Sequence, residues 1–366
     1  SAQIILFDKG QSVSFATCGI PYYLGDVIKD RDRLNVFDAD EFNSILNVEL
    51  RVLSEVTSIN RDRKSITVKD YKTDCVYEES YDKLVLAPGG QAIFPEIDGI
   101  DSPHAFTIRD AYDTDAVKEY IASHGCKNAL IIGGGYIGLE MADNLHNIGM
   151  DVTIVDMSDQ VMGSIDYEMA SVLHRHLEQK KVRLLLKDEV VSINKFSVTL
   201  KSRKTLFADI IILALGIKPD ARLARQSGLR VGTHGGILVN KGMVSNDEHI
   251  YALGDAVEVK DSLTQGQALV PLAGLAHKQA RVVAENICGM HHSIKNTQTT
   301  AIAKIFDLCA AVTGSSEKAL IARGINYKKS YIEAPARAGF YPGAFLMSIK
   351  LLFAANTGRL FGAQVV

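Results

Sequence analysis

Cys18 is the residue with the clearest potential for redox chemistry. It lies in the segment SFATCGIPYYLGD, in which Pro21 suits the first turn of a helix. Cys18 would then sit just ahead of a helix N-terminus, where free N–H groups and the helix dipole favour the thiolate. No second cysteine lies within five positions, so its oxidised form must be a sulfenic acid or a mixed disulfide with a small thiol.

A glycine-rich turn predicts a second kind of chemistry, dinucleotide binding. GGGYIG, from Gly133 to Gly138, follows an apolar strand at 129–132 and precedes a helical stretch that runs to about Asn147. In this order Gly133 allows the tight turn, Gly135 lets the backbone approach a pyrophosphate, and Gly138 lets the helix pack closely on the strand. The diphosphate would lie on the helix N-terminus.

The strand VTIVD follows that helix and ends at Asp156. An acidic residue in this place accepts hydrogen bonds from a ribose 2′-hydroxyl and repels a 2′-phosphate. Met157 and Ser158 come next and supply no compensating cation. The sequence therefore favours NADH over NADPH.

Internal repetition indicates two related nucleotide-binding lobes. LVLAPG (Leu84 to Gly89) is echoed by IILALG (Ile211 to Gly216), and IILFD, ending at Asp8, is echoed by VTIVD. If the first lobe keeps the spacing of the second, its first glycine precedes residue 1, so we expect the chain to begin after its own first phosphate loop. The alternative is that these are generic parallel strands.

Composition excludes several other classes of protein. The chain has 366 residues, with 40 Lys plus Arg against 43 Asp plus Glu, and so lacks a broad positive field for nucleic acid. Its apolar runs are far shorter than the roughly 18 residues of a spanning helix, and no signal peptide is visible, so we expect a cytoplasmic protein without membrane contact. Five cysteines without a CxxC pair fit neither a disulfide framework nor a zinc site. No metal is expected.

Later segments complete the predicted organisation. HIYALGDAVEV reads as a strand that delivers Gly254 and Asp255 to a ligand, with a helix following from about Leu272. From about Thr300 short β-rich runs indicate a smaller antiparallel domain.

We predict an α/β fold with two Rossmann-like nucleotide-binding domains plus a C-terminal α+β domain, truncated at both ends; that the last is a dimerisation domain is implied only by the family resemblance given in the next paragraph. The boundaries, with the domain roles that this resemblance implies, are 1–111 and 241–299 for an FAD-binding domain, 112–240 for an NAD-binding domain and 300–366 for the start of a dimerisation domain.

Six segments resemble those of a known family, in the chain order SFATCGIPYYLGD, LAPG, GGGYIGLE, ALGIKPD, YALGDAVEV and AGFYPGA. Together they resemble the single-cysteine branch of the pyridine nucleotide-disulfide oxidoreductases, especially coenzyme A disulfide reductases and NADH-dependent persulfide reductases. NADH oxidases and peroxidases are related members of that branch. The resemblance extends over essentially the whole chain.

The resemblance implies that the chain binds FAD and NADH. Asp8 matches the residue that holds the FAD adenosine ribose, and Asp255 the one at the ribityl or phosphate groups. Tyr136 resembles the ring that shields the flavin until nicotinamide displaces it, with Glu140 near the flavin edge and Gly216 lining the nicotinamide pocket. The implied cofactor-binding residues are Asp8, Ala87, Gly89, Arg109, Gly133, Gly135, Tyr136, Gly138, Glu140, Asp156, Gly216, Gly254, Asp255, Leu272 and Ala273.

Substrate and catalytic residues are also implied by the resemblance. Cys18 matches the redox cysteine beside the flavin, and Tyr341, in AGFYPGA, the tyrosine that acts as general acid across a homodimer interface. The implied substrate-binding residues are Ser14, Thr17, His277 and Lys278, which match positions near the coenzyme A chain. Three alternatives stay open: Tyr136 as a packing residue, Tyr341 as a turn aromatic, and Lys278 as a solvated charge.

The sequence departs from the family at two points. Pro88 stands where many relatives have threonine in an ATG motif, although the coenzyme A reductase branch tolerates proline. The expected loss of the first phosphate loop would remove the helix terminus that binds the FAD pyrophosphate, together with basic residues for coenzyme A.

The leading functional hypothesis is an FAD enzyme that passes electrons from NADH through Cys18 to coenzyme A disulfide or a related small disulfide or persulfide. Coenzyme A is then a substrate or a mixed-disulfide partner. The alternative is an NADH oxidase or NADH peroxidase that cycles through a Cys18 sulfenic acid. A non-catalytic nucleotide-binding protein is a third interpretation.

Overall fold

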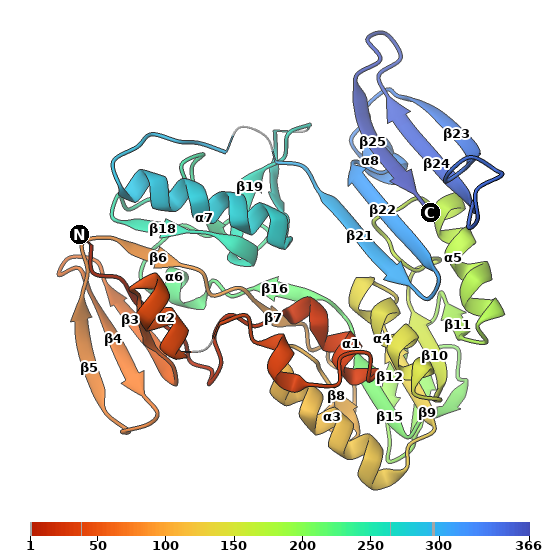
Figure 1. The fold of residues 1–366 in the computed structure, drawn as a ribbon, viewed down its shortest axis with the longest axis horizontal. Coiled ribbons are helices and arrows are strands. Elements are labelled where there is room, and N and C mark those ends of the chain that lie inside the picture. The colour runs from red at the N-terminus through yellow and green to blue at the C-terminus, as the bar shows by residue number, and fades with distance from the viewer. Residues whose placement is uncertain (1, 38, 264, 295–296) are drawn as a thin grey trace. The chain divides into compact units, whose positions relative to one another are not determined.

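The computed structural model describes residues 2–37, 39–263, 265–294 and 297–366. The chain forms two compact units (Figure 1). Unit 1 comprises Ser1–Thr17, Arg31–Gln91 and Ile217–Gln298, and unit 2 comprises Cys18–Asp30, Ala92–Gly216 and Thr299–Val366. These compact units divide the chain at other positions than the predicted cofactor-binding domains, whose boundaries stay a prediction.

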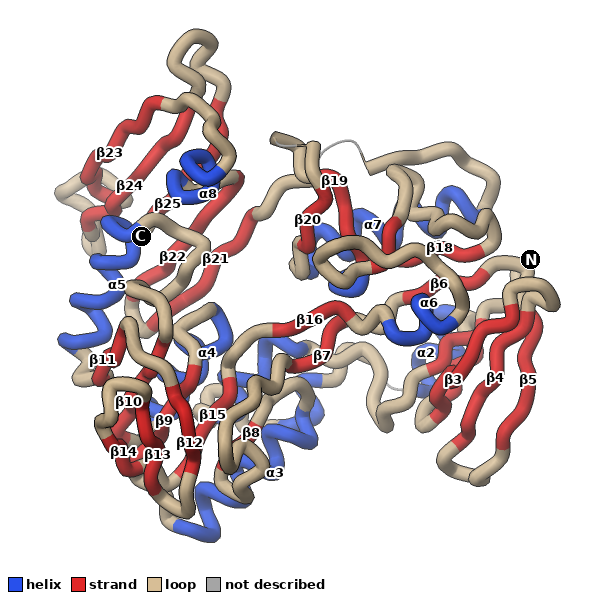
Figure 2. The backbone as a smooth tube through the Cα atoms, turned by 180° about the vertical axis from the view of Figure 1, so that it is seen from behind, coloured by secondary structure: helices blue, strands red, loops and turns tan. Residues whose placement is uncertain are grey.

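Unit 1 is built from short sheets joined around an apolar core. Strands β18 and β6 are parallel neighbours, so the segments that follow them leave the pair at the same edge. Strands β3, β4 and β5 form an antiparallel meander, and they lie side by side in both views (Figures 1 and 2). Its strands are β1 (Ile5–Phe7), β2 (Glu49–Arg51), β3 (Ser54–Asn60), β4 (Ser65–Asp70), β5 (Val76–Ser80), β6 (Leu84–Leu86), β7 (Gly90–Ala92, which ends across the boundary), β16 (Ile217–Pro219), β17 (Ile237–Leu238), β18 (Ile250–Ala252), β19 (Val257–Lys260) and β20 (Gln267–Leu269). Its helices are η2 (Arg31–Leu34), α2 (Ala39–Leu46), α6 (Arg222–Gln226), η3 (Gly254–Ala256) and α7 (Ala273–Ile287).

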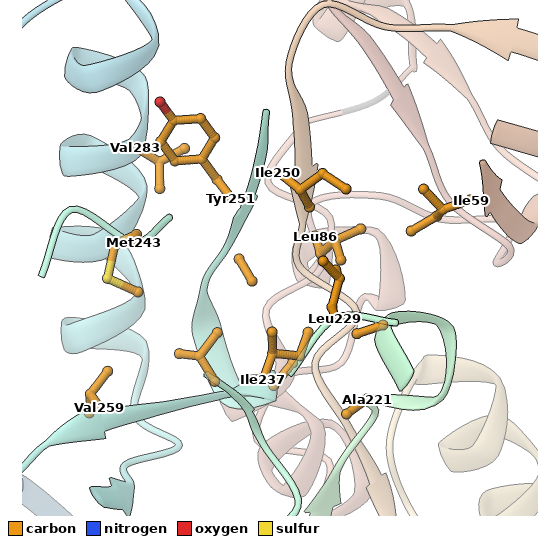
Figure 3. Packing of buried hydrophobic residues seen from close by; sticks show 14 of the residues in the cluster. Ile59, Leu86, Ala221, Leu229, Ile237, Met243, Ile250, Tyr251, Val259 and Val283 are labelled. Atoms are coloured by element: carbon orange, nitrogen blue, oxygen red, sulfur yellow. The ribbon is translucent and has the colours of Figure 1, made fainter. Parts of the chain in front are cut away.

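The core of unit 1 joins α7 to the parallel pair. Val283 of α7, Tyr251 of β18 and Leu86 of β6 belong to one buried cluster, and Ile59 of the meander extends it (Figure 3). Because apolar burial is the main driving force of folding, this cluster fixes the meander and α7 around the β6–β18 pair.

Unit 2 contains the predicted dinucleotide-binding βαβ element. A parallel sheet has the strand order β11–β10–β9–β15–β8, and β12–β13–β14 form an antiparallel meander. The strands are β8 (Ala105–Phe106), β9 (Asn128–Ile132), β10 (Asp151–Asp156), β11 (Arg183–Leu186), β12 (Val190–Ile193), β13 (Ser197–Leu200), β14 (Thr205–Phe207) and β15 (Ile210–Leu213). The helices are η1 (Thr17–Gly19, which crosses the boundary), α1 (Ile20–Leu24), α3 (Ala111–His124), α4 (Tyr136–Asn147) and α5 (Tyr167–Gln179).

The parallel sheet is buried on both faces, as its apolar strands predict. Leu130 and Ile132 of β9 pack with Val198 of the meander, so Ala129 and Ile131 point to the opposite face because strand side chains alternate. Those two residues are also buried, and α4 packs against β9 and β10. The predicted strand–turn–helix–strand order is therefore confirmed.

A C-terminal antiparallel sheet completes unit 2. Its strand order is β21–β22–β25–β24–β23, which confirms the antiparallel sheet predicted from about residue 300. The elements are β21 (Thr300–Ile305), β22 (Leu308–Gly314), α8 (Glu317–Ala322), β23 (Lys328–Pro335), β24 (Leu346–Phe353) and β25 (Leu360–Val365). With the parallel sheet, it confirms the mixed α/β class.

A buried cluster of charges connects this sheet to α5. Lys350 of β24 has no exposed side-chain surface, and its Nζ lies 2.8 Å from Asp166 Oδ2 and 2.6 Å from both Glu168 Oε1 and Glu317 Oε2. Gln364 of β25 donates to Asp166 Oδ2 at 2.7 Å. No local sequence pattern predicts this cluster.

Within the described ranges, no helix is both long and apolar enough to cross a membrane.

Candidate active site

The turn between β9 and α4 fits a phosphate group. Gly133 has a φ of +108°, and a Cβ there would lie 2.4 Å from the carbonyl oxygen of Ala214. A Cβ on Gly138 would lie 2.0 Å from the Gly133 carbonyl oxygen, whereas one on Gly135 would meet no atom within 4 Å. No side chain caps the N-terminus of α4, so its first N–H groups are left for an anion beside the open space at Gly135.

Asp156 closes this loop from the end of β10. Its Oδ2 accepts the Gly134 N–H at 2.6 Å, and its Oδ1 accepts the Ser158 N–H at 2.7 Å. Each carboxylate oxygen can accept a further hydrogen bond, so the arrangement still fits ribose hydroxyl groups. Met157 is 74% exposed, and both hydrogen bonds described for this carboxylate come from backbone N–H groups rather than from a cation that would favour a 2′-phosphate.

The segment after β10 packs against the phosphate loop between β9 and α4. The Tyr136 hydroxyl lies 2.8 Å from Ser164 Oγ, and burial raises the pKa of Tyr136. The Val161 N–H donates to Nε2 of His174 at 3.1 Å, and Val161 lies against Gly134, where an added Cβ would approach to 2.9 Å. The arrangement holds Tyr136 and backs the phosphate loop.

Cys18 is exposed and lies in η1, directly before α1. Pro21 is in the first turn of α1 as predicted, although this helix has only five residues and so a small dipole. α3 fixes α1, because the Tyr23 hydroxyl donates to Asp115 Oδ1 and Lys118 Nζ donates to the Tyr23 carbonyl, both at 2.9 Å. Cys18 is therefore an accessible thiol that directly precedes a helix fixed to α3 by hydrogen bonds.

An acidic group of α4 faces the same segment. Burial raises the pKa of Glu140, and the neighbouring Asp143 carboxylate raises it further. Burial also raises the pKa of Tyr22, with smaller contributions from Glu140, Asp143, Cys309 and Cys18. Tyr22 of α1 thus lies among the predicted residues Cys18 and Glu140 within unit 2.

The other predicted residues of unit 2 lie in three separate places. Arg109 is exposed before α3, and its N–H donates to Asp113 Oδ2 at 2.9 Å. Gly216 follows β15 with a φ of +89°. Tyr341 is 57% exposed in the turn between β23 and β24, with the Arg337 guanidinium 5.5 Å from its ring centroid.

The predicted flavin residues of unit 1 gather at the ends of β6 and β18. The Leu253 N–H donates to the Leu86 carbonyl at 3.0 Å, so the segment with Ala87 and Gly89 runs close to Gly254. Gln279 of α7 is 1% exposed, and its Oε1 accepts the Gly254 N–H at 2.8 Å. Burial raises the pKa of Asp255.

The N-terminus of α7 adjoins this cluster. Its N-cap Leu272 leaves the first turn without a side-chain cap, and the helix packs against η3, which contains Gly254 and Asp255. The uncapped N–H groups beginning at Ala273 fit an anionic or polar part of FAD. His277 and Lys278 are exposed on the same helix, where they are accessible to a ligand.

Asp8, Ser14 and Thr17 lie in the N-terminal part of unit 1. Asp8 Oδ1 accepts the Gly10 N–H at 2.7 Å, which holds the carboxylate at the end of β1. Ser14 has a φ of 58°, and its carbonyl accepts the Val36 N–H at 2.9 Å. Thr17 is exposed at the start of η1, next to Cys18 in the sequence.

Three residues that support the predicted cofactor-binding positions could not be identified from the sequence. Ser164 and Gln279 contact the predicted residues Tyr136 and Gly254 from 28 and 25 positions away. His174 acts indirectly, because it accepts the N–H of Val161, which lies against the predicted loop at Gly134. A neutral polar residue in a helix or loop has no local signature of such a role. Among the described residues, no cluster of His, Cys, Asp and Glu could hold a metal ion.

Comparison with known proteins identifies the family. The family model described as pyridine nucleotide-disulphide oxidoreductase matches residues 1–280. The chain belongs to this family. The predicted resemblance is thereby confirmed at the family level.

The similar proteins include disulfide and persulfide reductases. The coenzyme A disulfide reductase of Staphylococcus haemolyticus is 33% identical over 366 residues, which are 100% of this chain and 82% of that protein. Reduced Bacillus anthracis CoADR-RHD is 42% identical, with a TM-score of 0.98 over 99% of this chain and 66% of that one. The NAD-dependent persulfide reductase of A. fulgidus is 33% identical, with a TM-score of 0.96 over 100% of this chain and 69% of that one.

An oxidase has the same fold. The water-forming NADH oxidase of Lactobacillus brevis is 27% identical, with a TM-score of 0.94 over 100% of this chain and 81% of that one. The chain is therefore an oxidoreductase of a family that uses FAD and NAD(P)H. The phosphate loop at Gly133–Gly138 fits the nicotinamide dinucleotide, and the cluster at Asp255 and α7 fits FAD.

Proposed function

We propose that this protein transfers electrons from NADH to coenzyme A disulfide or a related small disulfide or persulfide through Cys18. The observation that carries the proposal is an exposed, free Cys18 in η1, directly before α1 and in the same compact unit as the glycine loop and Asp156. Relatives named coenzyme A disulfide reductase and persulfide reductase support this substrate class.

The residues of this chain divide the reaction between them. The N–H groups at the start of α4 and the Asp156 carboxylate hold the dinucleotide, while the Asp255 cluster and α7 hold FAD. FAD, when bound, accepts hydride from NADH and supplies an electron pair to a disulfide. The Cys18 thiolate attacks one sulfur of the substrate disulfide, which forms a mixed disulfide and releases one thiolate.

Reduction of that mixed disulfide returns Cys18 to the thiolate and releases the second thiol. Over one cycle NADH, one proton and one disulfide give NAD⁺ and two thiols. Tyr341 is proposed to protonate the departing thiolate, because its hydroxyl is a donor on an exposed turn. Ser14, Thr17, His277 and Lys278 are proposed to contact the substrate.

A homodimer is proposed as the working assembly. Large apolar side chains are exposed around Tyr341, with Phe340 at 90%, Phe345 at 77% and Leu346 at 69% exposure. Contiguous exposed apolar surface is typical of a protein interface. The molar mass of the full-length protein in solution, from light scattering, tests this part.

The decisive experiment compares wild type with Cys18→Ser in the full-length, flavin-loaded protein. We expect NADH oxidation that depends on coenzyme A disulfide in the wild type and a loss of at least about 100-fold in the variant. Cys75→Ser is the matched control, because Cys75 is also free and exposed but lies in the meander of unit 1. Equal rates in wild type and Cys18→Ser would refute the proposal.

An NADH oxidase or peroxidase is the second candidate function. The likeness to a water-forming NADH oxidase favours it, and an exposed Cys18 could cycle through a sulfenic acid. NADH-dependent consumption of oxygen or peroxide without any thiol substrate, at a rate above that with the disulfide, would establish this alternative.

A further inference from the structure

Helix α1 packs against α4 at a single close glycine contact. A Cβ added to Gly25, the C-cap residue of α1, would lie 2.4 Å from Oδ1 and 2.7 Å from Cβ of Asn144. Real Cβ contacts are essentially never under 3.0 Å. The closest approach of the two helices is therefore set by glycine on one side and asparagine on the other.

Asn144 is buried in an unusual way. It is 1% exposed, and its Nδ2 donates to the Glu140 carbonyl at 2.8 Å within α4. Its Oδ1 has no hydrogen-bond partner among the described residues. A buried acceptor without a donor is unfavourable, so a role in helix packing alone does not account for asparagine at this position.

The contact joins α1, which follows Cys18, to α4, which follows the phosphate loop. α4 begins at Tyr136, directly after its N-cap Gly135 in the phosphate loop, and reaches Asn144 about two turns later. α1 follows Cys18 through η1 without an intervening loop. Because η1 and α1 are continuous, we expect a displacement of α1 at Gly25 to move the segment that contains Cys18, against the restraint that the Tyr23–Asp115 hydrogen bond places on α1.

We propose that Gly25 and Asn144 are positioning residues that set where Cys18 lies relative to the nucleotide-binding loop at the start of α4. The inference rests on the proposed function of Cys18 and deepens it. Tyr22 of α1, whose pKa is raised by burial and by the α4 carboxylates Glu140 and Asp143, would move together with α1.

The test adds a methyl group on α1 and, in a double variant called the exchange variant, also removes the facing side chain on α4. Gly25→Ala adds the methyl group that meets Asn144, and Gly25→Ala combined with Asn144→Gly removes every atom that it meets at that residue. We expect Gly25→Ala to lower the kcat of coenzyme A disulfide reduction about 10- to 100-fold, because a shift near 1 Å is enough for such a loss. The exchange variant should recover to within about 3-fold of wild type.

A second activity separates positioning from general damage. NADH-dependent reduction of ferricyanide by the flavin does not require the cysteine, so its rate and the KM for NADH should stay unchanged in Gly25→Ala. Gly163→Ala is the matched control, because a Cβ at that glycine meets no atom within 4 Å. Equal loss of both activities in Gly25→Ala, or no recovery in the exchange variant, would overturn the inference.

A chemical readout keeps the inference distinct from the substrate proposal. The rate of Cys18 alkylation by iodoacetamide, measured by mass spectrometry with Cys75 as the internal reference, should change at least about 5-fold in Gly25→Ala and return in the exchange variant. If wild type does not reduce coenzyme A disulfide, the proposed substrate fails while this result still decides the positioning role. Should Gly25→Ala not fold, Asn144→Ala replaces it, and wild-type alkylation in that variant would refute the inference.

Discussion

Replacing Lys350 with methionine would leave three carboxylates without the ammonium group that they share. Methionine keeps the length of the lysine stem, so the apolar packing of β24 changes little. Asp166 and Glu317 have side chains only 5% and 15% exposed, and Lys350 itself has none exposed. Removing one partner of a buried ion pair typically destabilises a protein by about 3–5 kcal/mol. We expect Lys350→Met to lower the free energy of unfolding by about that amount at neutral pH.

The pKa of Glu317 limits the part of this loss that comes through Glu317, because Tyr327 and Lys329 share in lowering it. Burial alone would raise this pKa, but hydrogen bonds from Lys350, Tyr327 and Lys329 outweigh burial and lower it from 4.5 to about 2. A shift of this size corresponds to about 3 kcal/mol. Because the folded pKa lies below the unfolded one, the stabilisation is present above pH 4.5 and is lost as the pH falls toward 2. The difference between wild type and Lys350→Met should therefore shrink over that window.

The assay is urea-induced unfolding followed by far-ultraviolet circular dichroism, at neutral pH and at several acidic values. Lys201→Met is the matched control, because Lys201 pairs with Glu189 at 2.9 Å on the exposed surface, and we expect no measurable change. Adding Glu317→Gln to Lys350→Met should restore part of the stability, since it removes an uncompensated charge. A loss below about 1 kcal/mol for Lys350→Met, or a loss independent of pH, would refute the reasoning.

Three further predictions concern the nucleotide-binding loop. Gly138→Ala should abolish or strongly weaken NADH binding, measured by fluorescence titration, because its Cβ would lie 2.0 Å from a carbonyl oxygen of the loop; binding within about 2-fold of wild type would contradict the close packing. Asp156→Ala combined with Met157→Arg should raise the NADPH-to-NADH ratio of kcat/KM by at least about 10-fold, because a cation replaces an anion at the ribose; steady-state kinetics with both nucleotides checks it. Burial lowers the pKa of His174 below 6.5, and the Glu178 and Asp159 carboxylates partly oppose this. The neutral form of His174 therefore stabilises the fold above pH 6.5, and that stabilisation is lost as the pH falls below 6.5. Below pH 6.5 the KM for NADH should rise, less so in His174→Gln, and a flat wild-type profile would count against the hydrogen bond to Val161.

The fold was largely predictable wherever local patterns determine structure. The apolar strands at 129–132 and 152–156 and the glycines between them predicted β9, α4 and β10, because backbone dihedrals and side-chain period depend on nearby residues. The helix after Cys18 was also predicted, from Pro21, although its five residues make it shorter than a strong dipole requires.

The candidate site was predictable only as a set of separate motifs. Gly254 and Asp255 were selected from one strand end, and Leu272 and Ala273 from the following helix, but the hydrogen bond from Gly254 to Gln279 that joins them was not. Nothing in the sequence around Gln279 distinguishes a buried amide from a surface one. Its role depends on which chain segment lies opposite, and that is a tertiary property.

The amino-acid sequence alone determined the nucleotide loop, the redox cysteine and the family, because each is a short pattern whose chemistry and geometry are local. The tertiary structure alone decided that Lys350 is buried against a residue 182 positions away, and that Gly25 meets Asn144. Such contacts depend on the packing of elements that are distant in the sequence. The residues next to a lysine, a glycine or an asparagine do not indicate which distant residue it contacts. The physical reason is that backbone dihedral preferences depend on residues adjacent in the sequence, whereas burial depends on residues that are distant in the sequence and close in space.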